Sequence, residues 1–117
     1  MDESRIPDTL RAERAAALVR ITAITSEFDG IVVDSQHANA DDEHDPEGST
    51  IAYERARVAA LMARAQLNLD DLDHALARLA AGCYSVCEGC GKGIPPERLA
   101  ALPAVRTCFE CAKAGRP

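Results

Sequence analysis

Four of the five cysteines occur as two CxxC pairs. Cys87 and Cys90 lie in CEGC, Cys108 and Cys111 lie in CFEC, and seventeen residues separate the pairs. Two pairs at this separation match the spacing of a zinc site. Each CxxC turn presents two thiolates to a metal ion, and two such turns complete a tetrahedron. The sequence therefore predicts one zinc ion held by these four cysteines.

A redox function for either CxxC pair is the main competing interpretation. Thioredoxin-like motifs lie within a βαβ pattern, and this sequence contains none. Iron in a four-thiolate site is left open by the residue types alone. With four protein ligands no position remains for water, so the expected role of the zinc is structural rather than catalytic. The fifth cysteine, Cys83, falls on an apolar helix stripe, and we expect it to pack rather than bind metal.

Four bases lie near the cysteines in the sequence: Lys92, Arg98, Arg106 and Lys113. Four thiolates around a dication carry a net charge of about −2, which these bases can offset locally. The alternative is that they form a contact patch for a partner, with Arg98 and Arg106 as the candidate contacts.

The composition of the 117 residues favours thin helices over a thick core. Hydrophobic residues make up 47%, but aromatic residues only 3%, and tryptophan is absent. Much of the apolar content is alanine, which forms helices readily but fills little core volume. The net charge of −6 opposes direct binding to nucleic acid phosphates and better suits a positively charged protein partner.

The amino-terminal stretch MDESRIPDTL lacks the basic and apolar regions of a signal peptide. No run approaches the roughly 20 apolar residues of a membrane span. We therefore expect a cytoplasmic protein that does not bind a membrane, in a compartment where clustered thiols more often bind metal than form disulfides.

Two long segments carry helical periodicity. The first is expected to run from about Pro7 to a point between Phe28 and Asn39, and the second from about Pro46 to Ala81, followed by Gly82 as a carboxyl-terminal cap. The apolar stripe of the first comprises Leu10, Ala17, Ile21, Ile24 and Phe28. The second has heptad positions at Ile51, Val58, Ala65, Leu72 and Leu79, interleaved with Met62, Leu69, Leu76 and Cys83.

The stretch NADDEHDPEGST, residues 39–50, is a turn by composition. Asp45 followed by Pro46 is typical of a helix cap and first helical residue. A short polar turn between matched amphipathic helices predicts an antiparallel hairpin, rather than one continuous helix or a parallel dimer. The expected fold is all-α: a long antiparallel two-helix coiled-coil hairpin (residues 1–82, acidic tip near 40–50) with a carboxyl-terminal C4 zinc finger (residues 83–117).

Two polar features of the second helix are expected to be exposed. Asp70, Asp71 and Asp73 are most simply a solvated helix face, and His74 is isolated.

A two-helix rod also offers no pocket for a substrate. We therefore expect no enzymatic activity from this chain.

The stretch GCYSVCEGCGKGIPPERLAALPAVRTCFEC, which begins at Gly82, resembles the C4 zinc finger of the DksA/TraR family of bacterial transcription regulators. The shared pattern is Gly82 and Tyr84 before CxxCG, then IPPERLAALP, then CxxC. The upstream hairpin is similar to the coiled coil of that family, so the resemblance spans most of the chain.

The resemblance implies binding to RNA polymerase rather than to promoter DNA. Members of the family insert the coiled coil into the secondary channel of the polymerase, with the tip near the catalytic centre, where they change the lifetime of promoter complexes. An acidic rod suits a channel with basic walls, because complementary charge steers association. The alternatives are a zinc-stabilised adaptor for another protein and, third, a DNA-binding finger.

The tip motif of the family, Asp-x-x-Asp-x-Ala, is half kept here. Asp45 holds the first acidic position, Gly48 replaces the second aspartate and Thr50 replaces the alanine. The residues that the resemblance assigns to a partner-binding tip are Asp42, Glu43, Asp45, Glu47 and Thr50.

Cooperation with the alarmone ppGpp is expected to be weak or absent. Members that bind it use basic residues on the coiled coil near the finger and on a carboxyl-terminal helix. Here the corresponding stretch LNLDDLDHALARL is mostly neutral or acidic, and only AKAGRP follows Cys111.

Overall fold

The computed structural model describes residues 5–39 and 46–115, and the side chains of residues 5–30 and 50–115. Its elements are four helices: α1 (Ile6–Asn39), α2 (Pro46–Ala81), α3 (Pro96–Ala101) and α4 (Phe109–Lys113). Within these residues the only β-type pairing is an isolated antiparallel bridge between Val86 and Gly93. The bounds of α2 agree with the predicted segment at both ends.

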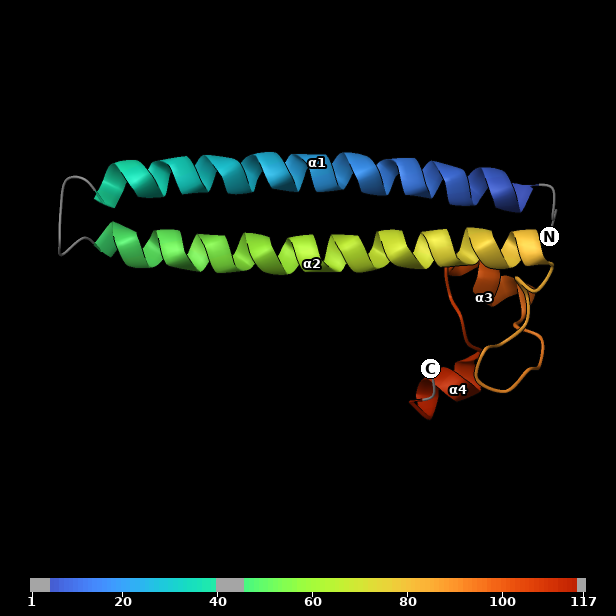
Figure 1. Cartoon of the computed structure of the whole chain (residues 1–117). Helices are drawn as coiled ribbons and strands as arrows, with labels where there is room; N and C mark the ends of the chain where they lie inside the picture. Colours follow the sequence, from blue (N-terminus) through green and yellow to red (C-terminus); the bar gives the residue numbers. More distant parts are fainter. Residues whose placement is uncertain (1–4, 40–45, 116–117) are drawn as a thin grey trace. The chain divides into compact units, whose positions relative to one another are not determined.

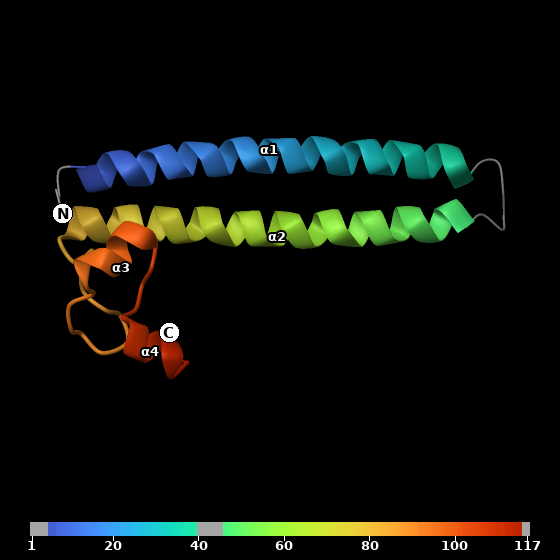
Figure 2. The same ribbon diagram turned by 180° about the vertical axis from the view of Figure 1, so that it is seen from behind.

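The chain divides into two compact units. We call residues 17–68 the helical unit, and residues 5–16 with 69–115 the finger unit. In each unit a segment of α1 lies beside an antiparallel segment of α2 (Figures 1 and 2). Together with the cysteine cluster described below, this confirms the predicted fold class, an all-α antiparallel coiled-coil hairpin with a C4 zinc finger.

The helical unit is held by one apolar seam. Ile24 from α1 and Val58 and Ala65 from α2 are buried in it. Side chains packed against them are Ile21, Phe28, Leu61 and Met62. Six of the seven occupy positions of the predicted stripes, because residues three and four apart lie on one helix face. Leu61 was not among the predicted positions; it lies three residues after Val58 and so faces the same side.

The finger unit has a more varied core. Leu10 of α1 and Leu72 of α2 are fully buried, and Tyr84, Ile94 and Leu99 are buried among the finger residues. Arg14 of α1 donates a hydrogen bond of 2.5 Å to Asp73 of α2, which links the two helices at their surface.

The carboxyl end of α2 is closed by Gly82, as predicted. Its φ is +80°, in the left-handed region that favours glycine. The Cys83 N–H donates to the carbonyl of Arg78 at 3.0 Å, and the Gly82 N–H donates to that of Leu79 at 3.1 Å. The chain thereby leaves the helix with these carbonyls satisfied and enters the first cysteine pair.

Candidate metal centre

The first cysteine pair lies in a tight loop closed by its own backbone. The Cys87 N–H donates to the Lys92 carbonyl at 2.7 Å, and the Gly91 N–H donates to the Cys87 carbonyl at 2.9 Å. Gly91 has φ of +77°. This conformation is strained for any residue with a Cβ, so a glycine directly after Cys90 is required by the turn.

The second pair lies at the start of α4. Cys108 is the residue before the first helical position, and Cys111 lies in the helix and is buried. The Ala112 N–H donates to the Cys108 carbonyl at 3.0 Å. One helical turn therefore sets the spacing between these two thiols.

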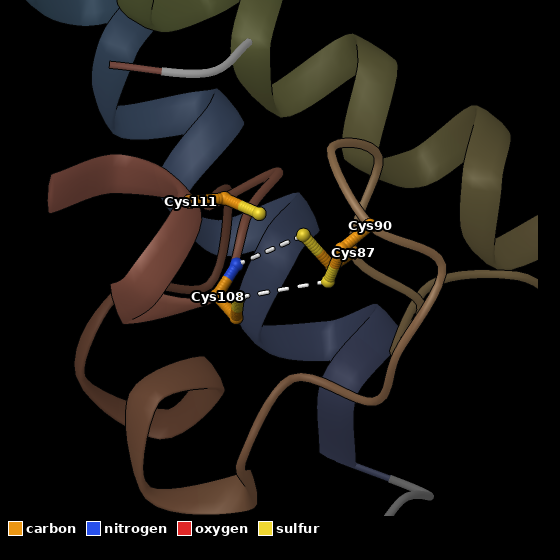
Figure 3. Close-up of side chains that lie close together, drawn as sticks. All are labelled: Cys87, Cys90, Cys108 and Cys111. Atoms are coloured by element: carbon orange, nitrogen blue, oxygen red, sulfur yellow. Dashed lines mark hydrogen bonds between the residues drawn. The ribbon is translucent and has the colours of Figure 1, made fainter. Parts of the chain in front are cut away.

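The structure brings the four predicted cysteines together (Figure 3). Their sulfur atoms all lie within 4.8 Å of one another, and the Cys90 and Cys108 sulfurs are 3.8 Å apart. A tetrahedron with Zn–S bonds of about 2.3 Å has S···S edges of about 3.8 Å. The arrangement therefore fits a tetrahedral zinc ion with all four positions filled by thiolates.

Backbone N–H groups prepare one of the thiols for metal binding. The N–H groups of Gly89 and Cys108 point at the Cys87 sulfur, at 3.3 Å and 3.2 Å. Burial alone raises the pKa of Cys87. Hydrogen bonds to its sulfur from the backbone N–H groups of Cys108, Cys90 and Gly89 and from the Cys90 thiol outweigh burial and lower the pKa to about 6. Burial, together with hydrogen bonds to the other three thiols, raises the pKa of Cys111 to about 12. Zinc binding at neutral pH therefore has to displace the proton of Cys111.

Cys83 lies outside the cluster of four. It is half-buried and forms no disulfide, as expected for a packing residue.

Arg98 and Arg106, predicted as possible partner contacts, both bind within the finger unit. The Nε of Arg98 donates to the Thr107 carbonyl at 2.9 Å, directly before Cys108. Arg106 donates to Asp71 of α2 at 2.7 Å. Both side chains remain half-exposed, so these bonds leave part of each available to a partner.

From the sequence, the polar residues of α2 were expected only to face solvent. In the structure several of them also bind other side chains. Asp71 pairs with Arg106 and Asp73 with Arg14. His74 shares a hydrogen bond with Glu88, the residue after Cys87. This bond is the main cause of a lowered pKa of Glu88. Burial opposes the shift, and the positive charges of Arg78 and Arg106 add to it.

A sequence signal for this set was available. Asp71, His74 and Arg78 are three and four residues apart, which places them on one face of a helix. A polar stripe at that spacing, directly before a finger, indicates a face that contacts the finger.

The predicted tip falls largely outside this description. Asp42, Glu43 and Asp45 lie outside the described residues, and Glu47 lies in the first turn of α2 with its side chain undescribed. Thr50 is exposed on α2.

The sequence around the four cysteines matches a known type of zinc finger. Residues 82–114 match the prokaryotic dksA/traR C4-type zinc finger, and these residues include all four clustered cysteines. Residues 82–114 of the chain are therefore a C4 zinc finger of the dksA/traR type. Its C4 finger holds one zinc ion, so the prediction of a single structural zinc is confirmed.

Two curated proteins are similar to part of the chain. The protein YteA of Bacillus subtilis strain 168 is 40% identical over 72 residues, which are 62% of this chain and 30% of YteA. A protein of Aquifex aeolicus strain VF5 is 44% identical over 45 residues, or 38% of this chain and 31% of that protein. The matches thus span less than a third of each of these curated relatives.

The solved structure of transcription factor DksA2 from Pseudomonas aeruginosa is similar over nearly the whole chain. It has a TM-score of 0.77 and 25% identity, covering 97% of this chain and 84% of DksA2. The likeness therefore includes both long helices as well as the finger. Within residues 5–39 and 46–115, no helix is long and apolar enough to span a membrane.

Proposed function

We propose that this protein is a transcription regulator that binds RNA polymerase by inserting its coiled-coil hairpin into the secondary channel, without recognising DNA. The observation that carries the proposal is the likeness to transcription factor DksA2 over 97% of the chain, hairpin and finger together. The net charge of −6 supports it, because an acidic protein is attracted to a channel with basic walls and repelled by DNA.

Residues 1–82 then form the delivery arm and residues 83–117 the zinc finger. Asp45 and its acidic neighbours in the segment 40–50 act near the catalytic centre of the polymerase. The finger stabilises the base of the hairpin, and its exposed Leu102 and Phe109 offer apolar surface for docking on the polymerase. In this proposal the chain regulates a reaction rather than catalysing one, and it works in the cytoplasm, where the polymerase is.

The decisive experiment is purification of polymerase on the tagged, zinc-loaded chain, followed by transcription in vitro. Core subunits should be retained, and the lifetime of promoter complexes should change. The proposal fails if no polymerase is retained and transcription is insensitive to the protein. Retention of another protein would favour the zinc-stabilised adaptor, and a gel shift with duplex DNA alone would favour a DNA-binding finger.

Two variants separate an effector tip from a binding surface. Asp45→Asn should leave polymerase binding unchanged but alter the effect on transcription, because the change removes one tip charge and keeps the side-chain volume. Asp29→Asn, at an exposed position of α1, is the matched control and should change neither. Loss of binding in Asp45→Asn would make the tip an anchor instead.

We also propose that cooperation with ppGpp is weak. The bases beside the α2 segment of the finger unit, Arg14 and Arg106, are already paired with Asp73 and Asp71, so binding a multiply phosphorylated nucleotide there would have to break these ion pairs. Addition of ppGpp to the transcription assay should therefore change the effect of the protein little. A strong dependence on ppGpp would contradict this part of the proposal.

A further inference from the structure

Arg78 is buried in the last turn of α2, although the charge of an arginine makes burial costly. Its exposed fraction is 8%, and among the described side chains the only other buried polar one is that of Thr107. Charged side chains are rarely buried to this degree unless they are paired. The partners of Arg78 therefore indicate its role.

These partners lie on both sides of the first zinc ligand. The Nη2 of Arg78 donates to the carbonyl of Cys83 at 2.9 Å and to that of Val86. Its Nε lies 3.4 Å from the carboxylate of Glu88. Val86 and Glu88 immediately precede and follow Cys87, whose exposed fraction is 1%. One guanidinium therefore contacts the chain before and after the same cysteine.

The finger residues form no long helix or sheet in which their backbone N–H and C=O groups could be hydrogen bonded. The carbonyls of Cys83 and Val86 precede the metal site in an irregular segment. The Cys83 carbonyl also accepts from the Val86 N–H at 3.2 Å, and Arg78 fixes both carbonyls relative to the end of α2. The planar guanidinium offers several N–H donors in a fixed arrangement, so one side chain can bind two carbonyls and a carboxylate together. A lysine ammonium cannot reproduce that geometry.

The charge of Arg78 also suits the metal. Zinc with four thiolates carries a net charge of about −2, and a fixed positive charge behind Cys87 offsets part of it. Glu88, which would oppose this effect, is itself hydrogen bonded to His74. Side chains that hold metal ligands from behind typically change metal affinity about 10–100-fold when they are removed.

We propose that Arg78 is a positioning residue of the zinc centre, which holds the Cys87 loop in its ligating conformation and partly neutralises the thiolates. Arg78 lies before residues 82–114, the part of the chain that matches the family's finger. Zinc affinity is therefore set partly by the last turn of α2. This inference does not depend on polymerase binding.

The test is zinc affinity by chelator competition on the full chain, together with the visible absorption spectrum of the Co²⁺-loaded chain. The Co²⁺ spectrum reports thiolate geometry at the metal. Arg78→Gln should lower zinc affinity about 10–100-fold and shift the Co²⁺ bands. Arg78→Lys keeps the charge but loses the fork of donors, so its affinity should lie between those of Arg78→Gln and the unchanged chain. Arg64→Gln, at an exposed position of α2, is the matched control and should change neither readout.

The proposal is overturned if Arg78→Gln binds zinc within about twofold of the unchanged chain with the same Co²⁺ spectrum, well short of the expected fold-change. It is also overturned if Arg64→Gln loses as much affinity. Circular dichroism at 222 nm checks that Arg78→Gln retains its helices. If Arg78→Gln loses its helices, the Arg78→Lys variant is used instead. Weaker zinc binding and shifted Co²⁺ bands in Arg78→Lys support the proposal. Unchanged zinc affinity and an unchanged Co²⁺ spectrum refute it.

Discussion

The finger unit and the helical unit are stabilised in different ways. In the finger unit, directional contacts are frequent: four sulfurs converge, a buried arginine binds two carbonyls, and the Tyr84 hydroxyl donates to the Pro103 carbonyl at 2.7 Å. In the helical unit the seam of Ile24, Val58 and Ala65 is apolar, and an ion pair such as Arg57 with Glu27 lies at the surface.

The difference follows from the backbone. A long helix satisfies its own N–H and C=O groups, so two helices need only a shared apolar stripe to associate. The irregular chain of a finger has no such ladder, so its polar groups must find side chains, metal-bound sulfurs or one another. Specific residues are therefore concentrated where regular structure is absent, and the predictions below test this contrast.

The largest effect is expected from removal of a zinc ligand. Cys108→Ser should abolish stable zinc binding and unfold the finger, because the binding free energy of a structural zinc, about 10–16 kcal/mol, is folding free energy. The helical unit should retain its helices. Metal analysis and circular dichroism measure the two outcomes, with Cys83→Ser as the control that retains zinc. A normal zinc content in Cys108→Ser would contradict the assignment of the four ligands.

Removal of a buried side chain from the helical unit should have the opposite result: the helices lose stability, and zinc binding is unaffected. Ile24→Ala leaves a void in the seam and should cost about 2 kcal/mol of unfolding free energy, near the lower end for such changes because the seam is thin. Zinc affinity should stay unchanged. Urea unfolding followed at 222 nm gives the cost, and Val19→Ala, at a position that is 70% exposed on the same helix, is the control. A fall in zinc affinity would show that the two units are energetically coupled.

Tyr84 and Tyr53 allow the same substitution in each unit. Tyr84→Phe should cost about 1 kcal/mol at pH 8, because the hydrogen bond to Pro103 is lost. Tyr53 of the helical unit is 71% exposed, so Tyr53→Phe should change the unfolding free energy little. The measurement is urea unfolding of both zinc-loaded variants.

The effect of Tyr84 should also depend on pH. Burial, and then the Glu13 carboxylate, raise the pKa of Tyr84 above its ordinary value of 10.0. A raised pKa means that its stabilisation is fully present below pH 10 and is lost as pH rises through the folded-state pKa. The difference between the unchanged chain and Tyr84→Phe should therefore shrink above pH 10. A difference that is constant from pH 8 to 11 would contradict this account.

The smallest effect is expected for the surface ion pair. Glu27 accepts a hydrogen bond of 2.6 Å from Arg57, which also bonds to Glu54. Glu27→Gln should change the unfolding free energy only slightly, since exposed ion pairs contribute little to stability and Arg57 keeps a second partner. High salt should abolish the difference in urea unfolding. A cost as large as that of Tyr84→Phe would mean that the helical unit relies on polar contacts as the finger unit does.

The sequence predicted features that repeat or follow a local rule. The heptads from Ile51 to Leu79 predicted the apolar face of α2. Gly82 predicted the end of that helix, and the cysteine spacing predicted the metal site. Each of these depends on geometry within a few turns of chain.

Features that depend on how the finger folds against α2 were not predicted. His74 was expected to be isolated, but Glu88 of the cysteine loop lies beside it. Asp71 was expected in a solvated face, but Arg106 reaches it from 35 positions further along the chain. Such pairs join side chains across irregular segments of the chain. Helical periodicity in the sequence therefore cannot predict them.

The division of the chain into units has a consequence for protein synthesis. The helical unit is continuous in sequence, from residue 17 to residue 68, whereas the finger unit combines residues 5–16 with residues 69–115. A ribosome therefore completes the helical unit before any of the four zinc ligands is made. The first turns of α1, which include Arg14, therefore acquire partners such as Asp73 only after residues 17–68 have been made. The helical unit can form its apolar seam while the start of α1 still lacks the rest of its own unit.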